Sequence, residues 1–450
     1  MESYQKMGVV ALFQDQGTTK AQRAQRQAAR RRGLSGVLMR PAFVPLCLCG
    51  SIPCYTRRMF SFHTAGESHG QALITLVEGV PAHLAVDFEF IDNELRRRQK
   101  GNGRGGRMKI ERDQVRFLSG VRQGKTLGSP VAMMIENRDW PNWEEIMSVR
   151  EIAGDAATKR RVTRPRPGHT DLSGSLKFNH TDARNILERS SARETAARVA
   201  AGGLAKIFLR VFGVEVLSHT TAIGTVRVPD DFSVSWEQLE AVRDDDVVRC
   251  VLPEFSDAMV KEIEMAQKDG DTLGGTFEII ARGVPTGLGS HTSWDSRLDG
   301  RLAQAIMSVN AVKGVEIGQG VRVAYSRGSV AHDEIAYDAE QRRFYRLSNR
   351  AGGIEGGITN GEDVRVVGYL KPIPTLKKAL RSVDMISKEP FLAQHERSDT
   401  CTVPAAGVIG EAMVALVLAG AFLEKFGGDS MPEVTRNYEG YLEQLREYPG

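Results

Sequence analysis

The sequence predicts an α/β protein whose sheets are antiparallel or mixed, and three observations support this. Short stretches of alternating or continuous apolar residues between residues 60 and 135 are typical of strands. Longer segments with apolar residues at helical spacing lie mostly after residue 190. The two kinds of element interleave without the strict strand–helix–strand order of a doubly wound parallel sheet. The 450 residues exceed the usual size of one domain, about 100–200 residues, but they are compatible with one large α/β body.

The apolar pattern places each element along the chain. Strands are predicted at 60–62, 72–78, 84–88, 108–111, 115–119 and 131–135, and helices at 91–98, 191–211, 235–242, 256–268, 299–312, 375–382 and 403–425. In the helix 299–312, four apolar residues from Leu302 to Val309 recur at helical spacing and form a core-facing stripe. The long apolar run from Val403 to Phe422 contains Glu411 and several glycines. A membrane span rarely tolerates such a glutamate, so we expect a buried, alanine-rich helix and no membrane partner.

Charge is distributed unevenly over the chain. The formal net charge is +4, but residues 1–58 carry ten basic and two acidic residues, so the remainder has a charge of −4. The body is therefore no nucleic-acid binder by bulk charge, and any positive potential there must be local. Only Cys250 and Cys401 lie in the body, too few and too far apart for a disulfide framework or a metal site.

The segment Arg189–Thr195 predicts a helix start that can hold an anion. Ser191 can cap the helix and Glu194, three residues later, can reach back to form a capping box. A helix start with free backbone N–H groups, serine hydroxyls and a nearby arginine is suited to phosphate. Alone, the pattern is more typical of an ordinary capped helix than of a ligand site.

Two glycine-broken loops each present a histidine among polar residues. The loop Thr64–Gly70 contains His69, and the loop Arg164–Asp171 contains His169. Two prolines and a glycine in the second loop prevent a helix. A single loop histidine is usually structural, but with two in such settings acid–base chemistry near neutral pH is as well supported as a structural role.

The glycine-rich loop Gly101–Gly106 matches the dinucleotide-binding pattern G-x-G-x-x-G in spacing only. That motif needs a strand before it and a helix after it, whereas here a charged helix precedes and a strand-like segment follows. Arg98, Arg104 and Arg107 make the region a mobile positive surface suited to phosphate or carboxylate. The alternatives are a solvated loop or an RNA-binding tract, although the tract lacks repeats and interleaved aromatic residues.

Eight short motifs make the sequence similar to the chorismate synthase family, whose members catalyse the last shared step of the shikimate pathway. Three are the two histidine loops and the Arg-Ser-Ser segment. The other five are Arg98–Met108, Ser308–Glu316, Asn349–Ile358, Lys371–Thr375 and Glu396–Cys401. They run in the family's order from about residue 59 to the C-terminus, which is far more specific than one short pattern.

The resemblance implies a single large α/β domain, a β-α-β-α sandwich with mixed or antiparallel sheets enclosing a helical layer, and a homotetramer. It implies a lyase of aromatic amino acid biosynthesis that converts 5-enolpyruvylshikimate 3-phosphate to chorismate and phosphate by 1,4-elimination. The family needs reduced FMN without net redox change, and either NADPH or an external flavin reductase would reduce the flavin. We expect a cytoplasmic enzyme with a small-molecule substrate, no metal and no nucleic-acid partner.

The resemblance also assigns catalytic residues. His69 matches the histidine thought to protonate the departing phosphate, and His169 matches the one that interacts with the reduced flavin ring. Ser68 and Asp399 match a pair proposed to relay the proton that the substrate loses. On local sequence, Asp399 is equally suited to cap the helix that begins near Val403.

Binding residues follow in the same way. The expected FMN-binding residues are Arg189, Ser190, Ser191, Asn310, Ala311, Gly357, Lys371, Pro372, Ile373, Pro374, Thr375 and Arg397. Arg98, Arg104 and Arg107 are expected to bind substrate or NADPH. Independently of the family, the two prolines of 371–375 stiffen a turn, Thr375 can cap the predicted helix 375–382, and Lys371 lies at its anion-binding end.

Two other function classes stay open at this point. A flavin-dependent redox enzyme on an anionic substrate would share the flavin loops, and would consume NADPH in step with substrate. A non-catalytic anion- or RNA-binding protein would fail to bind flavin and would show a steep salt dependence on RNA. Neither class explains both histidine loops.

Residues 1–58 precede the family's first strand, which begins at about Met59. We therefore expect 59–450 to be the catalytic domain and 1–58 to be an extension outside the family. The stretch Lys20–Arg40 lacks acidic residues, as transit peptides do, but no convincing cleavage region follows it. We favour a mis-set translation start or a disordered extension over a targeting peptide.

Overall fold

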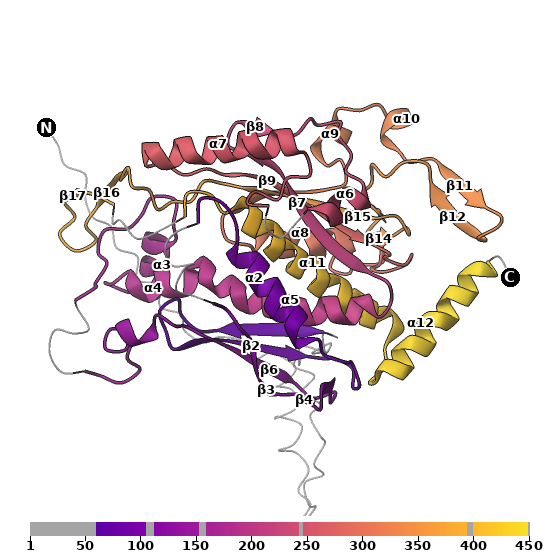
Figure 1. The fold of residues 1–450 in the computed structure, drawn as a ribbon, viewed down its shortest axis with the longest axis horizontal. Coiled ribbons are helices and arrows are strands. Elements are labelled where there is room, and N and C mark those ends of the chain that lie inside the picture. Colours follow the sequence, from indigo (N-terminus) through magenta and orange to yellow (C-terminus); the bar gives the residue numbers. More distant parts are fainter. Residues whose placement is uncertain (1–59, 105–111, 153–158, 243–245, 394–398, 449–450) are drawn as a thin grey trace, which may run out of the picture. The chain divides into compact units, whose positions relative to one another are not determined.

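The computed structural model describes residues 60–104, 112–152, 159–242, 246–393 and 399–448, all within one compact unit, Thr56–Gly450. The predicted strand 108–111, Arg107, Arg397 and the extension 1–58 lie outside the described residues. Within this unit, two antiparallel sheets enclose a layer of helices (Figure 1).

The first sheet comes from the N-terminal part of the unit. Its strands are β1 (Ser61–Ala65), β2 (Ala72–Glu78), β6 (Val131–Glu136) and β3 (Arg116–Ser119), in that spatial order and all antiparallel. Along β2 and β6, buried residues alternate with partly exposed ones. Alternation of this kind is typical of a sheet that packs on the core with one face only.

The second sheet has five strands in the order β10 (Val312–Ile317), β15 (Val364–Leu370), β9 (Gly275–Arg282), β7 (Glu215–Ile223) and β8 (Val226–Arg227), again antiparallel. Its strands β7 and β9 do not alternate, because both faces are covered, whereas buried residues alternate with more exposed ones along β15. Helices α6 (Trp236–Ala241) and α7 (Pro253–Asp269) contact one face, and α11 (Val403–Phe426) packs against the other.

The helical layer between the sheets consists of α2 (Phe88–Gln99), α5 (Thr195–Arg210) and α11. Helix α5 contacts β2 of the first sheet, and α11 contacts β7 and β9 of the second. The two helices approach closely at Gly202, where an added Cβ would lie 2.3 Å from the Cβ of Ala412. With α6 and α7 outside the second sheet, the layers form the predicted β-α-β-α sandwich.

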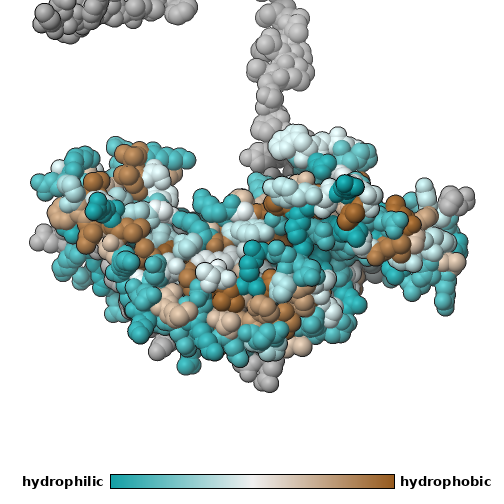
Figure 2. All heavy atoms as spheres, turned by 90° about the horizontal axis from the view of Figure 1, so that it is seen from above, coloured by the Kyte–Doolittle hydropathy of each residue, from teal (hydrophilic) through white to brown (hydrophobic). Residues whose placement is uncertain are grey.

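Helix α11 is long and apolar enough to cross a membrane, but almost all of its most apolar stretch is buried inside the protein. A helix that is hydrophobic on all sides is typical of the centre of a large core. On the face drawn in Figure 2, hydrophilic residues predominate and hydrophobic ones form separate patches. The predicted buried helix is therefore confirmed.

Smaller elements lie around this sandwich. The helices are α3 (Asp171–Phe178), α4 (Arg184–Ser190), α8 (Leu298–Met307), α9 (Val321–Ala324), α10 (Gly328–Ala331) and α12 (Met431–Arg446). The paired strands are β4 (Val121–Arg122) with β5 (Lys125–Thr126), β11 (Ile335–Asp338) with β12 (Arg343–Arg346), β13 (Ile354–Glu355) with β14 (Ile358–Thr359), and β16 (Arg381–Val383) with β17 (Pro390–Leu392).

Four predicted elements need correction. The predicted helix 299–312 corresponds to α8, which ends at Met307, and β10 begins at Val312. The predicted strand 84–88 instead leads into α2, whose first turn is capped by the side chain of Asp87. The predicted helix 375–382 does not form; the segment runs as a loop into β16. The predicted helix 191–211 begins later, at Thr195, after a short 3-10 helix at Ala192–Glu194.

A buried ionic cluster joins the three central helices to the second sheet. Glu411, in the middle of α11, accepts hydrogen bonds from Arg97 at 2.7 and 2.9 Å and from Ser218 Oγ at 2.6 Å. Lys206 of α5 bridges Glu411 and Glu94. Burial alone would raise the pKa of Glu411, but Arg97 and Lys206 outweigh it and lower that pKa.

We predict that Glu411→Gln lowers the free energy of unfolding by about 3–5 kcal/mol, because it leaves buried cationic groups uncompensated. The matched control is Glu424→Gln, which lies on the same helix as Glu411. It removes an exposed ion pair with Arg301 of α8 and should change stability by about 0–1 kcal/mol. Denaturant midpoints measure both changes. Equal midpoints for the two variants would contradict the role of the cluster.

The Glu411 contribution also depends on pH. Its folded-state pKa is below its ordinary value, so its stabilisation is complete above about pH 4.3, the usual glutamate value. The stabilisation is lost as pH falls toward the folded pKa. The difference in midpoint between wild type and Glu411→Gln should therefore shrink on acidification.

Candidate active site

The loop between β1 and β2 carries His69, which is held by a buried carboxylate. Nδ1 of His69 lies 2.9 Å from Oε1 of Glu188, and its backbone N–H donates to Oε2 at 2.8 Å. The N–H of the buried Ser68 donates to the carbonyl of Glu188 at 2.9 Å. The His69 side chain is still 16% exposed, so a ligand can reach it. Burial alone would raise the pKa of Glu188, but its bonds to His69 outweigh burial and lower it.

Trp143 forms one wall beside His69. The two rings stack with centroids 3.8 Å apart and planes 21° apart. The guanidinium of Arg160 lies 4.0 Å from the Trp143 ring centroid, and that of Arg184 lies 5.1 Å from it. Arg184 also donates to Glu188 Oε1 at 3.0 Å. The imidazole is therefore fixed both in its plane and at one ring nitrogen.

The second histidine has its own buried carboxylate. Nδ1 of His169 lies 2.6 Å from Oδ1 of Asp171, the first residue of α3. Arg166 binds both oxygens of Asp171, at 2.8 and 3.0 Å, and donates to Thr375 Oγ1 at 2.9 Å. Burial alone would raise the pKa of Asp171, but the bonds from His169 and Arg166 hold it well below its usual range.

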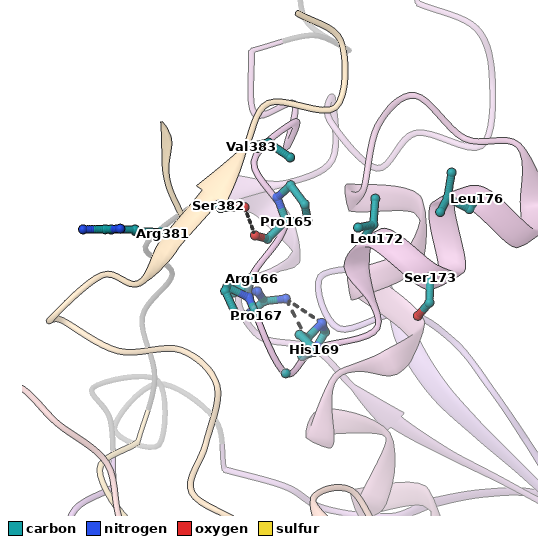
Figure 3. A pocket seen from close by; sticks show the side chains of 11 residues that line it. Pro165, Arg166, Pro167, His169, Leu172, Ser173, Leu176, Arg381, Ser382 and Val383 are labelled. Atoms are coloured by element: carbon teal, nitrogen blue, oxygen red, sulfur yellow. Dashed lines mark hydrogen bonds between the residues drawn. The ribbon is translucent and has the colours of Figure 1, made fainter. Parts of the chain in front are cut away.

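This loop borders a cavity of about 620 Å³ (Figure 3). Figure 3 shows His169 beside Arg166 at its centre, with α3 on one side and β16 on the other. Its lining residues are Pro165–His169, Leu172, Ser173, Leu176 and Arg381–Val383. Ser382 Oγ donates to the carbonyl of Pro165 at 2.5 Å, which ties β16 to the histidine loop.

The Arg189-Ser190-Ser191 segment differs from its prediction. Arg189 and Ser190 end α4, so they lie at the C-terminal end of one helix. Ser191 accepts the N–H of Arg193, but no capping box forms because Glu194 binds Thr64 and Arg198 instead. The predicted capping box is therefore wrong, while a binding role for these residues stays a prediction.

Hydrogen bonds connect the two histidine loops through the predicted flavin motifs. Arg189 donates to the carbonyls of Thr64 and Gly66, in the first histidine loop. The amide of Asn310 donates to the carbonyl of Ser190 at 3.0 Å. The N–H of Lys371 donates to the carbonyl of Ala311 at 3.0 Å.

Two further contacts complete this connection. Nζ of Lys371 donates to the carbonyl of Gly168, in the second histidine loop. Thr375 does not cap a helix but accepts from Arg166, and Ile373 accepts from Thr272 at 2.7 Å. The structure thus brings the segments around Ser190, Asn310 and Lys371 together.

The remaining predicted flavin residues lie as follows. Gly357 has a φ of +87°, and its carbonyl accepts the N–H of Leu298 at the start of α8. A Cβ at Gly357 would lie 2.8 Å from the side chain of Arg297. Its described contacts are thus with α8 and not with Ser190 or Lys371. Pro372 and Pro374 flank Ile373 in the loop that precedes β16.

The predicted mobile arginine surface is in part a buried network. Arg98 is only 3% exposed and donates to Asp113 at 2.8 Å, and Arg193 binds the same carboxylate at 2.6 and 2.7 Å. The pKa of Arg98 is lowered to about 10. Burial is the largest cause, and it outweighs the Asp113 carboxylate, which raises that pKa. Arg193 and Arg104 lower it further, so three guanidinium groups lie near one another. Arg98 is therefore neither mobile nor at the surface.

Asp399 joins this network. Arg104 binds Asp399 Oδ2 at 2.8 Å, and the N–H of Thr400 donates to the carbonyl of Gly103 at 2.7 Å. The N-cap of α11 is Thr402, so Asp399 does not cap that helix.

Asn137 ties the arginine network to the His69 loop. Its Oδ1 accepts from Arg193 Nε at 2.9 Å, and its Nδ2 donates to the carbonyls of Gly70 and Glu67. The arginines and His69 therefore belong to one connected site.

Sequence reasoning missed Glu188, Asp113, Arg193, Trp143 and Asn137, and it gave Asp171 no role. Asp171 lies two residues after His169, and Glu188 directly precedes the Arg189 motif. An acidic residue beside a site motif was therefore a usable signal for these two. Trp143 and Asn137 carry no such local signal, because only the fold brings them to His69.

Comparison with known proteins adds the family. The sequence model of the family described as chorismate synthase matches residues 60–423. A chorismate synthase of Solibacter usitatus is 56% identical over 392 residues, which cover 87% of this chain and 100% of that protein. One of Desulforudis audaxviator is 57% identical over 86% of this chain and 98% of its own.

A solved structure described as a crystal structure of chorismate synthase is also similar. It aligns with a TM-score of 0.69 and 42% identity, and the alignment covers 86% of this chain and 98% of that chain. The matches span the helical layer, both sheets and both histidine loops. The chain belongs to the chorismate synthase family.

Proposed function

We propose that the protein converts 5-enolpyruvylshikimate 3-phosphate to chorismate and phosphate by 1,4-elimination, and that it requires reduced FMN. Family membership makes it an enzyme of aromatic biosynthesis. The observation that carries the finer assignment is one connected site in which two carboxylate-bound histidines accompany clustered arginines. A substrate with one phosphate and two carboxylates needs that positive charge.

Two buried polar atoms support a flavin site at the junction of the predicted motifs. Ser190 Oγ and Asn310 Oδ1 are buried and have no hydrogen-bond partner within the described residues. Buried polar groups are normally hydrogen-bonded, so these two are suited to a bound ligand. Arg189 and Lys371 supply nearby cationic groups for a phosphate. Burial and the nearby Lys313 lower the pKa of Lys371.

The other predicted residues complete the proposed flavin site. They are Ser191, Ala311, Gly357, the loop Pro372–Thr375 and Arg397, and Arg397 lies outside the described residues. When bound, a reduced flavin supplies transient electron donation and proton acceptance that no side chain provides. NADPH or a separate flavin reductase is the proposed source of its electrons.

The chain's own residues bind the substrate and move protons. Arg104, with Arg98 behind it and Arg107 beyond the described residues, is proposed to bind the anionic groups of substrate or NADPH. His69 donates a proton to the departing phosphate, whose developing charge needs a proton or a cation. His169 holds the flavin side of the site. Ser68 and Asp399 are proposed to move the proton that the substrate loses.

The proposal extends to organisation. We propose that 59–450 is the catalytic domain, that 1–58 is an extension outside it, and that the enzyme is a cytoplasmic homotetramer. The family match at residues 60–423 supports that division. A relative that aligns over its full length covers only 87% of this chain, which also supports it.

We predict that chorismate and phosphate form in equal amounts only when FMN is reduced. The measurement is an anaerobic incubation with dithionite-reduced FMN, followed by chorismate absorbance and phosphate release. Oxidised FMN and dithionite alone are the controls. Stoichiometric flavin oxidation during turnover would instead indicate a redox enzyme, and phosphate release with oxidised flavin would indicate a phosphatase.

We predict that His69→Ala and His169→Ala each lower turnover by about 10- to 10⁴-fold, the usual range for loss of a general acid or base. The KM for substrate should change much less, because the arginines supply most of the binding charge. His291→Ala, in the loop before α8, is the control and should keep normal turnover. Near-normal turnover of either site variant would assign that histidine a structural role only.

We predict that Ser190→Ala weakens FMN binding by about 2- to 12-fold, the value of one hydrogen bond. Ser175→Ala is the matched control, because its hydroxyl is also buried without a described partner but lies outside the proposed site. Fluorescence titration with oxidised FMN, and anaerobic titration with reduced FMN and substrate, measure both. Equal affinity of the two variants would remove Ser190 from the flavin site.

A further inference from the structure

The two histidines share a local arrangement that the family assignment does not describe. In each, Nδ1 contacts a carboxylate, and an arginine binds that carboxylate from another side. Glu188 is 2% exposed and Asp171 is fully buried. A buried carboxylate with such partners is a costly feature, since removal of one partner leaves an uncompensated charge.

The distances define which ring nitrogen carries hydrogen. Oδ1 of Asp171 lies 2.6 Å from Nδ1 of His169, and both oxygens of Glu188 lie within 3.0 Å of Nδ1 of His69. A carboxylate oxygen only accepts, so a contact this short requires a proton on Nδ1. When such a histidine is neutral, its titrating atom is Nε2.

We propose that Glu188 and Asp171 are positioning residues that hold His69 and His169 as Nδ1–H donors and so direct Nε2 of each ring to the reaction. The proposal rests on the roles given above to the two histidines. Neither carboxylate needs to touch substrate or flavin, because each acts through its imidazole. Trp143 assists at His69 by stacking on the ring and fixing its plane.

The two arrangements differ in charge. The described charged groups near His69 come from three places. Glu188 and Arg184 lie on α4, and Glu67 lies on the same loop as His69. Arg160 lies over the Trp143 ring, and Asp139 accepts the indole N–H of Trp143. Glu188 uses its second oxygen for the backbone of residue 69 and receives one bond from Arg184. Glu188 is therefore bound by the imidazole and the backbone of residue 69 together.

Around His169, the described charged groups are Asp171, Arg166, Lys371 and Arg381. Arg166 binds both oxygens of Asp171 and lies 3.1 Å from Nδ1 of His169 itself. The guanidinium therefore neutralises the carboxylate that His169 contacts.

The test reads the imidazoles directly in the full-length protein. Selective ¹⁵N-histidine labelling and long-range proton–nitrogen NMR report tautomer and pKa, with His69→Gln and His169→Gln used to assign the signals. Wild type should show Nδ1–H in both neutral rings. Glu188→Gln should weaken the preference of His69 for Nδ1–H, because the charged acceptor of that hydrogen is lost.

The variants act as controls for each other. Asp171→Asn should alter the tautomer or pKa of His169 and leave His69 unchanged, and Glu188→Gln should do the reverse. Glu424→Gln, a carboxylate paired with Arg301, should alter neither. Turnover of each site variant should fall by about 10- to 100-fold with little change in KM, and the limb of the pH–rate profile that reports His69 should move with its measured pKa.

An unchanged His69 pKa and tautomer in Glu188→Gln would overturn the assignment, even if turnover fell. If that variant does not fold, the wild-type spectrum decides, since a neutral His69 with its proton on Nε2 contradicts the proposal. These readouts need neither flavin nor substrate. A failure of the proposed reaction would therefore appear in the turnover assay alone, with the imidazole spectra unaffected.

Discussion

The position of Glu411 is the constraint on which the central layer depends. Its two oxygens face different elements: Oε1 accepts from Ser218 of β7 and Oε2 from Lys206 of α5, while Arg97 of α2 spans both. Rotating α11 by one residue would break all of these bonds and bury the charge unpaired. Ala412, the residue after Glu411, contacts Gly202 of α5. A methyl group added at Gly202 would lie 2.3 Å from the Cβ of Ala412, so α11 has no room to move closer to α5.

That fixed register determines where the site segments emerge. The chain leaves the C-terminal end of α2 into the loop that carries Arg104, and one 3-10 turn separates Ser190 and Ser191 from the start of α5 at Thr195. Helix α11 begins at Val403, shortly after Asp399 and Thr400. Three separate parts of the site therefore take their positions from helices that one buried carboxylate joins. Loops then supply the chemistry on a rigid scaffold.

Sequence patterns predicted those parts of the fold in which one face is buried. Strands β2 and β6 alternate, and the helix near 299–312 has an apolar stripe, so both were found. In the second sheet, β7 and β9 gave no such signal, because both of their faces are covered, whereas β15 alternates but was not predicted. The predicted helix 375–382 failed because contacts of Thr375 with Arg166 outweigh its capping propensity.

The candidate site divides in the same way. Motif residues such as His69 and His169 were predicted because local sequence and the family resemblance both mark them. Both carboxylate partners were missed: Asp171 lies two residues from His169, whereas Glu188 lies 119 residues from His69 and only the fold pairs them. Arg98 was assigned to a surface because a helix end beside a glycine loop gives no information on burial. Long-range pairing is a property of the fold, which short motifs do not encode.

The place of α11 in the middle layer has a consequence for biosynthesis of the chain. Phe277 and Ile279 of the second sheet lie against Gly410, so the inner face of that sheet is covered by a helix near the C-terminus. During translation, β7 and β9 are synthesised more than a hundred residues before α11. During that interval the sheet has no cover for its apolar face, and such surfaces aggregate or recruit chaperones. Cooperative closure of the sandwich therefore waits for the end of translation.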